Sequence, residues 1–192
     1  MGETGARGRV EVAHEVAHEA VHACEHGARA RCLPEPWMCR VFHIDGSLRD
    51  IRVLDTSRVE WIAVLEHLRV MADETEVEHP YPRLDPVRPA AADLFRAWAD
   101  EPEDERSGFC FRARFGAVWF FALPCEEEEI EFSVRPEDVL DLAGVAAVLR
   151  FLVEVATAAR RPALLTGETA RYDPGMATLL SHDPATGLTS HT

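Results

Sequence analysis

The sequence predicts an α+β fold, in which an antiparallel β-meander packs against two main helices and an N-terminal helical extension precedes them. Three observations lead to this prediction. Polar and apolar residues alternate over 109–115 and again over 129–134, and a continuous apolar run, 118–123, lies between them. Two other segments, 58–71 and 142–160, carry apolar residues at helical spacing. A period of two is typical of half-buried strands and a period near 3.6 of amphipathic helices, so both element types are expected in one domain.

The two outer strands of the meander, 109–115 and 129–134, are expected to bury every second residue. Gly116 and Ala117 form the first turn, and residues 124–128 form the second. The apolar run between these turns is typical of a central strand that is buried on both faces. The residues expected to point inward from the two outer strands are Phe109, Phe111, Ala113, Phe115, Ile130, Phe132 and Val134.

Upstream of the meander, two short β-rich runs, 39–44 and 48–54, flank Asp45 and Gly46. An Asp-Gly pair between two such runs is a strong hairpin signal. Residues 73–89 are acidic and contain Pro80, Pro82, Pro86 and Pro89, so they are expected to form a long loop.

The helices have recognisable boundaries. Ser57 and Glu60 match an S-x-x-E capping box at the start of the first main helix. A short helix is expected at 90–98, and Pro162 ends the second main helix. The apolar face of that second helix is expected to comprise Leu142, Val145, Leu149, Leu152 and Ala156. Short closing strands at 163–166 and 177–181 and a turn at 183–187 complete the domain.

Length and charge limit the possible functions. The 192 residues fit one domain, 38–192, preceded by an extension, 1–37, that contains a disordered start, a His-rich helix and a linker. The formal net charge of −14 argues against a nucleic-acid partner and is compatible with a basic protein partner. All 20 basic residues are Arg, and Lys, Asn and Gln are absent, which indicates a GC-rich bacterial genome.

Cysteine usage and hydropathy indicate a cytoplasmic location. The five cysteines form no C-x-x-C pair, so free thiols in a reducing compartment are expected. The N-terminus has no apolar segment typical of a secretory signal. Apolar runs such as 117–123 are too short to span a membrane, so the sequence predicts no transmembrane segment.

A metalloprotease-like motif lies in the N-terminal extension. His14, Glu15 and His18 match H-E-x-x-H, and the pattern repeats from His18 to His22. On a helix, His residues four apart share one face and can bind zinc, with the intervening Glu as general base. Two observations weigh against catalysis: the register is ambiguous, and the metzincin third-ligand position is Cys24. We therefore assign no catalytic residue and no cofactor, and keep zinc binding by His14, His18 and His22 as the alternative.

Acidic runs are the candidate partner-binding residues. Neighbouring carboxylates at a turn are usually a solvated loop, but they can also dock a basic partner. The runs expected to form an acidic rim at the connections of the meander are Glu126, Glu127, Glu128 and Glu129, with Glu103, Asp104 and Glu105. Another acidic stretch comprises Asp73, Glu74, Glu76 and Glu78.

From residue 49 onward the chain resembles a known group of proteins. The segments that carry the resemblance are RDIRVLDTSRVEWIAVLEHL (49–68), EIEFSVRPEDV (129–139), RFLVEVATAARRPALLTGE (150–168) and ATLLSHDPATG (177–187). This succession is similar to the small bacterial α+β proteins encoded beside polymorphic toxins, a group that includes immunity proteins. The resemblance covers about 39–187 and implies a toxin as protein partner, but no binding residue can be carried over from it.

The expected function is therefore a non-enzymatic protein-interaction module, with toxin neutralisation through an acidic surface as its concrete form. The G-x-S-x-G, P-loop and G-x-G-x-x-G motifs are absent. A zinc-dependent hydrolase or a metal-binding protein is the alternative.

Overall fold

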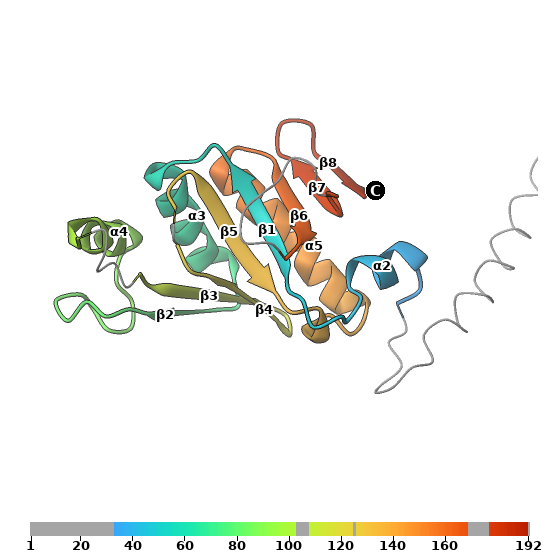
Figure 1. The fold of residues 1–192 in the computed structure, drawn as a ribbon, viewed down its shortest axis with the longest axis horizontal. Coiled ribbons are helices and arrows are strands. Elements are labelled where there is room, and N and C mark those ends of the chain that lie inside the picture. The colour runs from blue at the N-terminus through green and yellow to red at the C-terminus, as the bar shows by residue number, and fades with distance from the viewer. Residues whose placement is uncertain (1–32, 103–107, 125, 169–176, 192) are drawn as a thin grey trace, which may run out of the picture.

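The computed structural model describes residues 33–102, 108–124, 126–168 and 177–191. Its centre is an antiparallel sheet of eight strands in the order β2-β3-β4-β5-β1-β6-β7-β8 (Figure 1). The strands are β1 (Arg49–Leu54), β2 (Glu74–Glu78), β3 (Cys110–Phe115), β4 (Val118–Ala122), β5 (Glu129–Val134), β6 (Ala163–Gly167), β7 (Leu180–Asp183) and β8 (Leu188–His191). The helices are α2 (Pro36–Val41), α3 (Arg58–Met71), α4 (Ala91–Asp100) and α5 (Leu142–Ala159), with a short 3-10 turn, η3 (Pro136–Asp138). The α+β class and the β3-β4-β5 meander are confirmed.

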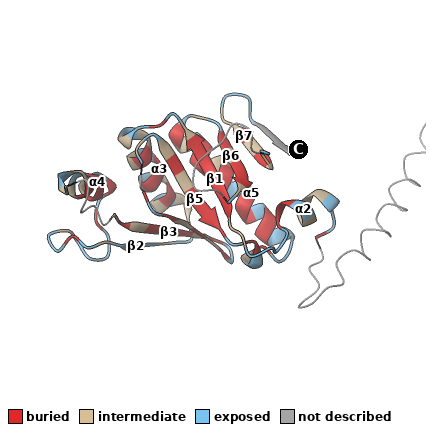
Figure 2. Ribbon diagram, viewed as in Figure 1, coloured by how far each residue is buried: buried red, intermediate tan, exposed pale blue. Residues whose placement is uncertain are grey.

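The two main helices, α3 and α5, pack against each other and cover one face of the sheet (Figures 1 and 2). Phe151 of α5 lies at the centre of this core and stacks on Phe120 of β4 with 3.8 Å between ring centroids. Phe115 and Phe132 meet the same ring edge-on, at 5.4 and 5.1 Å. Edge-to-face and offset-stacked rings add to the free energy of apolar burial. All seven meander residues expected to point inward are buried, which confirms the alternation.

The first turn of the meander and the start of α3 follow the local sequence closely. Gly116 has a φ of 59°. It occupies the first central position of a two-residue hairpin, where a type II′ turn requires a positive φ. Ser57 and Glu60 form the predicted capping box, with the Glu60 carboxylate accepting from the Ser57 backbone N–H at 3.0 Å. Residue 57 thus fixes where α3 begins.

α5 is more apolar than α3 and α4, and by length and composition it could cross a membrane, with a mean hydropathy of 1.8. Arg150 and Glu154 interrupt its apolar run, and the buried core helix of a soluble protein can have the same length and composition. Half of the helix is buried, and it packs on α3, β1, β3, β4, β6 and β7 as the central helix of the core. Leu142, expected on its inner face, is instead 53% exposed at the first turn, whereas Val145, Leu152 and Ala156 are buried.

Three predicted elements differ in the structure, and one strand was not predicted. Residues 39–44 form no strand, because Pro36 starts a helix, α2, and so Asp45-Gly46 closes no hairpin. The predicted loop 73–89 contains β2, whose pairing with β3 is a tertiary contact that local sequence does not report. β4 is not buried on both faces, since Trp119 and Phe121 remain half-buried. β8, which extends the sheet beyond β7, was not predicted.

Candidate functional site

The face of the sheet opposite α3 and α5 carries most of the polar side chains, and we call it the polar face. Strand register places side chains from six strands in one row across it. From β2 to β6 this row is Glu76, Arg112, Phe121, Ser133, Asp50 and Thr166. No helix of the described part of the chain lies over this face (Figure 1).

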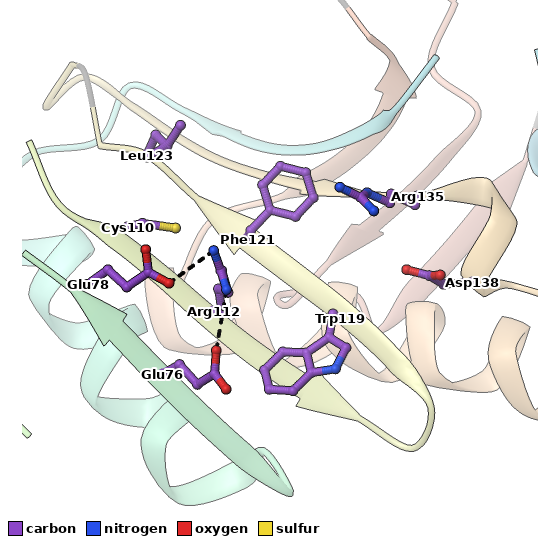
Figure 3. A pocket seen from close by; sticks show the side chains of 9 residues that line it. All are labelled: Glu76, Glu78, Cys110, Arg112, Trp119, Phe121, Leu123, Arg135 and Asp138. Carbon is purple, nitrogen blue, oxygen red and sulfur yellow. Dashed lines mark hydrogen bonds and ion pairs between the residues drawn. The ribbon is translucent and has the colours of Figure 1, made fainter. Parts of the chain in front are cut away.

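A groove of about 860 Å³ lies at the β2-β3-β4 end of the polar face (Figure 3). We call it the Arg112 groove, because Arg112 stands at its centre. Its lining residues come from β2, β3, β4, the loop after β4 and the turn after β5: Glu76, Glu78, Cys110, Arg112, Trp119, Phe121, Leu123, Arg135 and Asp138. The volume is in the range of binding clefts, and the lining combines aromatic and charged groups.

Ion pairs join the rim of the groove to its centre. Arg112 contacts Glu76 at 3.5 Å and Glu78 at 3.1 Å. Contact with the Cys110 sulfur, and then the Glu78 charge, raises the pKa of Arg112 further above its ordinary value. The Arg112 side chain is 42% exposed, and those of Glu76 and Glu78 are 46% and 65% exposed. Solvent-exposed pairs of this kind contribute at most about 1 kcal/mol each, so they can exchange for other partners.

The floor of the groove is apolar and accessible. Trp119 and Phe121 point to the polar face and are half-buried, and Leu123 is 62% exposed. The Arg114 guanidinium lies 5.8 Å from the centre of the Trp119 ring. This is a cation–π geometry. Aromatic residues and Arg are both enriched at the centres of protein interfaces.

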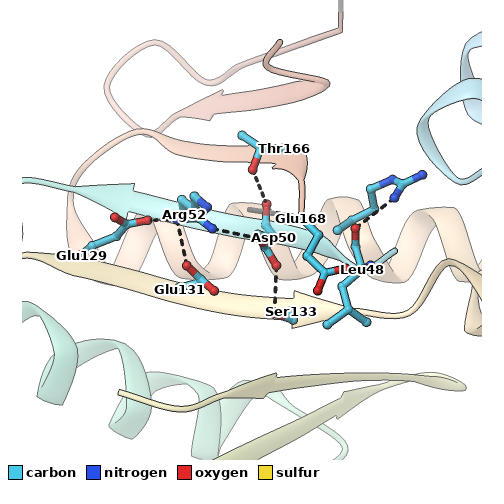
Figure 4. A network of polar contacts seen from close by, with 9 residues as sticks. Leu48, Asp50, Arg52, Glu129, Glu131, Ser133, Thr166 and Glu168 are labelled. Atoms are coloured by element: carbon cyan, nitrogen blue, oxygen red, sulfur yellow. Dashed lines mark hydrogen bonds and ion pairs between the residues drawn. The ribbon is translucent and has the colours of Figure 1, made fainter. Parts of the chain in front are cut away.

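Beside the groove, on β1 and β5, lies a buried charge cluster formed by Asp50, Arg52, Glu129 and Glu131 (Figure 4). The Arg52 side chain is fully buried and pairs with Asp50 at 2.9 Å, with Glu131 at 2.8 Å and with Glu129. The Ser133 hydroxyl donates to Asp50 at 2.9 Å.

Three carboxylates around one guanidinium leave an excess of negative charge. Burial, followed by repulsion from Asp50, raises the pKa of Glu131 to about 7, although Arg52 acts in the opposite direction. These two causes outweigh the attraction of Arg52 because Asp50 already shares that guanidinium. The cluster therefore changes charge near neutral pH.

Contacts with α3 and β1 hold the predicted acidic run 126–129 in place in the structure. Glu127 forms an ion pair with Arg58, and Glu129 pairs with Arg52. The Glu126 carbonyl accepts from the Trp61 indole N–H at 3.1 Å, so this run is anchored at the start of α3. Its exposed members are Glu126 and Glu128.

Other candidates lie outside the described residues. These are the acidic run Glu103, Asp104 and Glu105 and the histidines His14, His18 and His22. Within the described ranges, no group of three or more His, Cys, Asp or Glu residues is arranged to hold a metal ion. Cys39 and Cys110, the two cysteines that the structure covers, form no disulfide with each other.

Sequence reasoning missed the Arg112 groove. Its signals were present as two alternating patterns, glutamates at 74, 76 and 78 and arginines at 112 and 114. Their pairing becomes evident only once β2 and β3 are known to be neighbours.

Comparison with known proteins adds no relative. No protein-family model matches the chain, and no curated protein or solved structure shows significant similarity to it. The fold and the site define the class as an α+β protein with a polar, grooved sheet face.

Proposed function

We propose that the protein is a non-enzymatic protein-interaction module, and that a basic partner protein docks on its polar face. The observation that carries this proposal is the Arg112 groove, where Trp119, Phe121 and Leu123 form an accessible apolar floor between charged rims. Burial of aromatic floor residues is a usual source of affinity at interfaces, and the surrounding charges supply orientation.

Charge favours a basic partner over an acidic one. The net charge of −14 attracts cationic surfaces and accelerates their encounter. Near the groove, the exposed pairs of Arg112 with Glu76 and Glu78 can be replaced by contacts to arginine or lysine side chains of the partner. The exposed Glu126 and Glu128 add to this charge at the neighbouring corner.

The concrete form of the proposal is an immunity protein that neutralises a bacterial toxin in the cytoplasm. Its first support is the resemblance of residues 39–187 to proteins encoded beside polymorphic toxins. Its second support is the acidic surface, whose negative charge resembles that of the phosphate groups that a nuclease toxin binds in its substrate.

The test uses the product of the neighbouring gene as the candidate toxin. We expect co-expression of the wild-type protein to restore growth of cells that produce it, and the two purified proteins to form a complex. Leu123→Arg places a charge on the apolar floor of the groove and should weaken the complex at least tenfold, about 1.4 kcal/mol.

Val70→Arg is the matched control, because Val70 is 80% exposed on α3, on the other side of the sheet, and should bind as the wild type does. Absence of both a complex and growth rescue would contradict the toxin-neutralising role. Equal binding by Leu123→Arg and Val70→Arg would show that the partner does not dock in the groove.

A further inference from the structure

β2 is an edge strand of the sheet, and among the described residues it pairs only with β3. The direction of its backbone groups follows from the β3-β4 hairpin. In a two-residue hairpin the closing pair, here Phe115 and Val118, exchanges hydrogen bonds. The N–H and C=O groups of successive residues in a strand point to opposite sides. Those of Ala113 therefore point towards β4, and those of Arg112 and Arg114 point towards β2.

Register extends this pattern to β2. Glu74 lies opposite Arg114 and Glu76 opposite Arg112, so the backbone N–H and C=O groups of these glutamates bond to β3. The backbone groups of Thr75 and Val77, between them, consequently point away from the sheet. An edge strand with outward N–H and C=O groups is a template for an additional strand.

One side of this edge is acidic. Glu74, Glu76 and Glu78 project on the polar face, and their side chains are 49%, 46% and 65% exposed. An added strand would therefore meet a row of three carboxylates on this side, which favours basic side chains at every second position.

The other side of the edge has a different chemistry. Thr75 and Val77 project there and line a hollow of about 270 Å³, together with Val87, which is 73% exposed. Arg69 and Arg88 complete the lining of this hollow. Aliphatic side chains of an added strand can contact the two valines, whereas basic ones would be repelled by the two arginines.

A second copy of this chain does not suit the edge. Antiparallel pairing of two β2 strands centred on Glu76 would place Glu76 opposite Glu76 and Glu74 opposite Glu78. Like charges directly opposite each other are destabilising across strands. A strand with Arg or Lys at every second position and aliphatic residues between them complements both sides.

We propose that β2 accepts an extended, alternately basic and aliphatic segment of a partner protein as an antiparallel ninth strand of the sheet. Backbone hydrogen bonds to Thr75 and Val77 would supply affinity, and the glutamate row would select the sequence, as in other cases of strand addition. This inference extends the proposed function by naming a second contact and the conformation of the partner, and its test does not require the toxin.

The probe is a capped, fluorescently labelled peptide of alternating Arg and Val, as long as β2, titrated with the full chain and followed by fluorescence anisotropy. We expect saturable binding that slows amide exchange at Thr75 and Val77. The valines of the peptide would lie opposite Thr75 and Val77, and their amide N–H groups would donate to the backbone of β2. N-methylation of the valine amides should therefore weaken binding at least tenfold. N-methylation of the arginine amides, which would face away from β2, is the matched control and should have little effect.

Variants of the protein give a second measurement. Thr75→Pro removes an outward N–H and keeps the hydrogen bonds between β2 and β3, so the folded protein should lose peptide binding. Equal binding of the two N-methylated peptides, or unchanged binding by folded Thr75→Pro, would reduce the interaction to electrostatic adsorption and overturn the proposal. A failure of Leu123→Arg to weaken the toxin complex would instead count against docking in the groove.

Discussion

Arg52→Met tests whether the ion pairs of Arg52 in the buried charge cluster stabilise the folded protein. Arg52 is fully buried, and the side chains of Asp50 and Glu129 around it are only 2% and 18% exposed. Methionine fills a similar apolar length but leaves the carboxylates without their counterion. Removal of one partner from a buried ion pair costs about 3–5 kcal/mol, so we expect the free energy of unfolding to fall by about that amount at pH 8.

The loss should depend on pH in a defined direction. Without Arg52, the carboxyl groups bind protons more tightly in the folded protein than in the unfolded chain, so the folded state gains stability as the pH falls. We expect the difference between Arg52→Met and wild type to shrink from pH 8 to pH 5. Urea unfolding, followed by circular dichroism and tryptophan fluorescence at both pH values, measures it.

Arg112→Met is the matched control, since Arg112 lies on the same face and its ion pairs with glutamates are exposed. Each of these two pairs contributes at most about 1 kcal/mol, so this control should lose at most about 2 kcal/mol. If Arg52→Met cost no more than Arg112→Met, or if its cost were the same at pH 5 and pH 8, the reasoning about the buried cluster would be refuted.

Two further predictions concern the same sheet. The pKa of Glu131, about 7, lies above its ordinary 4.5, so the folded protein binds this proton more tightly and loses stability as the pH rises from 4.5 to 7. The Glu131 side chain is 38% exposed, so solvent screening reduces the effect. Glu131→Gln should therefore stabilise the protein by about 1 kcal/mol at pH 8 and by less at pH 5; a larger gain at pH 5 in urea unfolding would contradict the assignment. Phe151→Ala removes the ring that contacts Phe120, Phe115 and Phe132 and should cost about 3–5 kcal/mol in the same assay, whereas a cost under about 1 kcal/mol would show that this ring is not central to the core.

Elements with strong local signals were predictable from the sequence. The capping box at Ser57 and Glu60 specifies the start of α3 through contacts only three residues apart. The alternation of polar and apolar residues in β3 and β5 predicts which side chains face α5, and Gly116 predicts the turn that joins β3 to β4. In each case, the structure of the segment depends on residues that are close together in the sequence.

Elements that depend on distant partners were not predictable. The segment ETEVE of β2 lies between acidic and proline-rich residues and looks like a loop. It becomes a strand because its backbone pairs with β3, where Arg112 and Arg114 face Glu76 and Glu74 from 36 and 40 residues further along the chain. The run that forms α2 is apolar enough for a strand, but Pro36 favours the first turn of a helix, and Val41 is buried in the core.

The candidate site was missed for the same reason. Apolarity alone cannot distinguish a strand buried on both faces from one whose second face lies in an accessible groove, and β4 was assigned to the first class. Its Trp119 and Phe121 are half-buried because no described helix covers the polar face. The acidic run 126–129 was recognised, but two of its carboxylates pair with Arg58 and Arg52.

The central claim, that a partner docks on the polar face, is tested most directly by thiol labelling. Cys110 is a half-buried cysteine that lines the Arg112 groove, and Cys39 is a half-buried cysteine on α2, outside the groove. We predict that the neighbouring gene's product, at saturating concentration, slows maleimide labelling of Cys110 at least tenfold and leaves Cys39 unchanged, as read by peptide mass spectrometry. Labelling of Cys110 at the same rate in a demonstrated complex would contradict the claim.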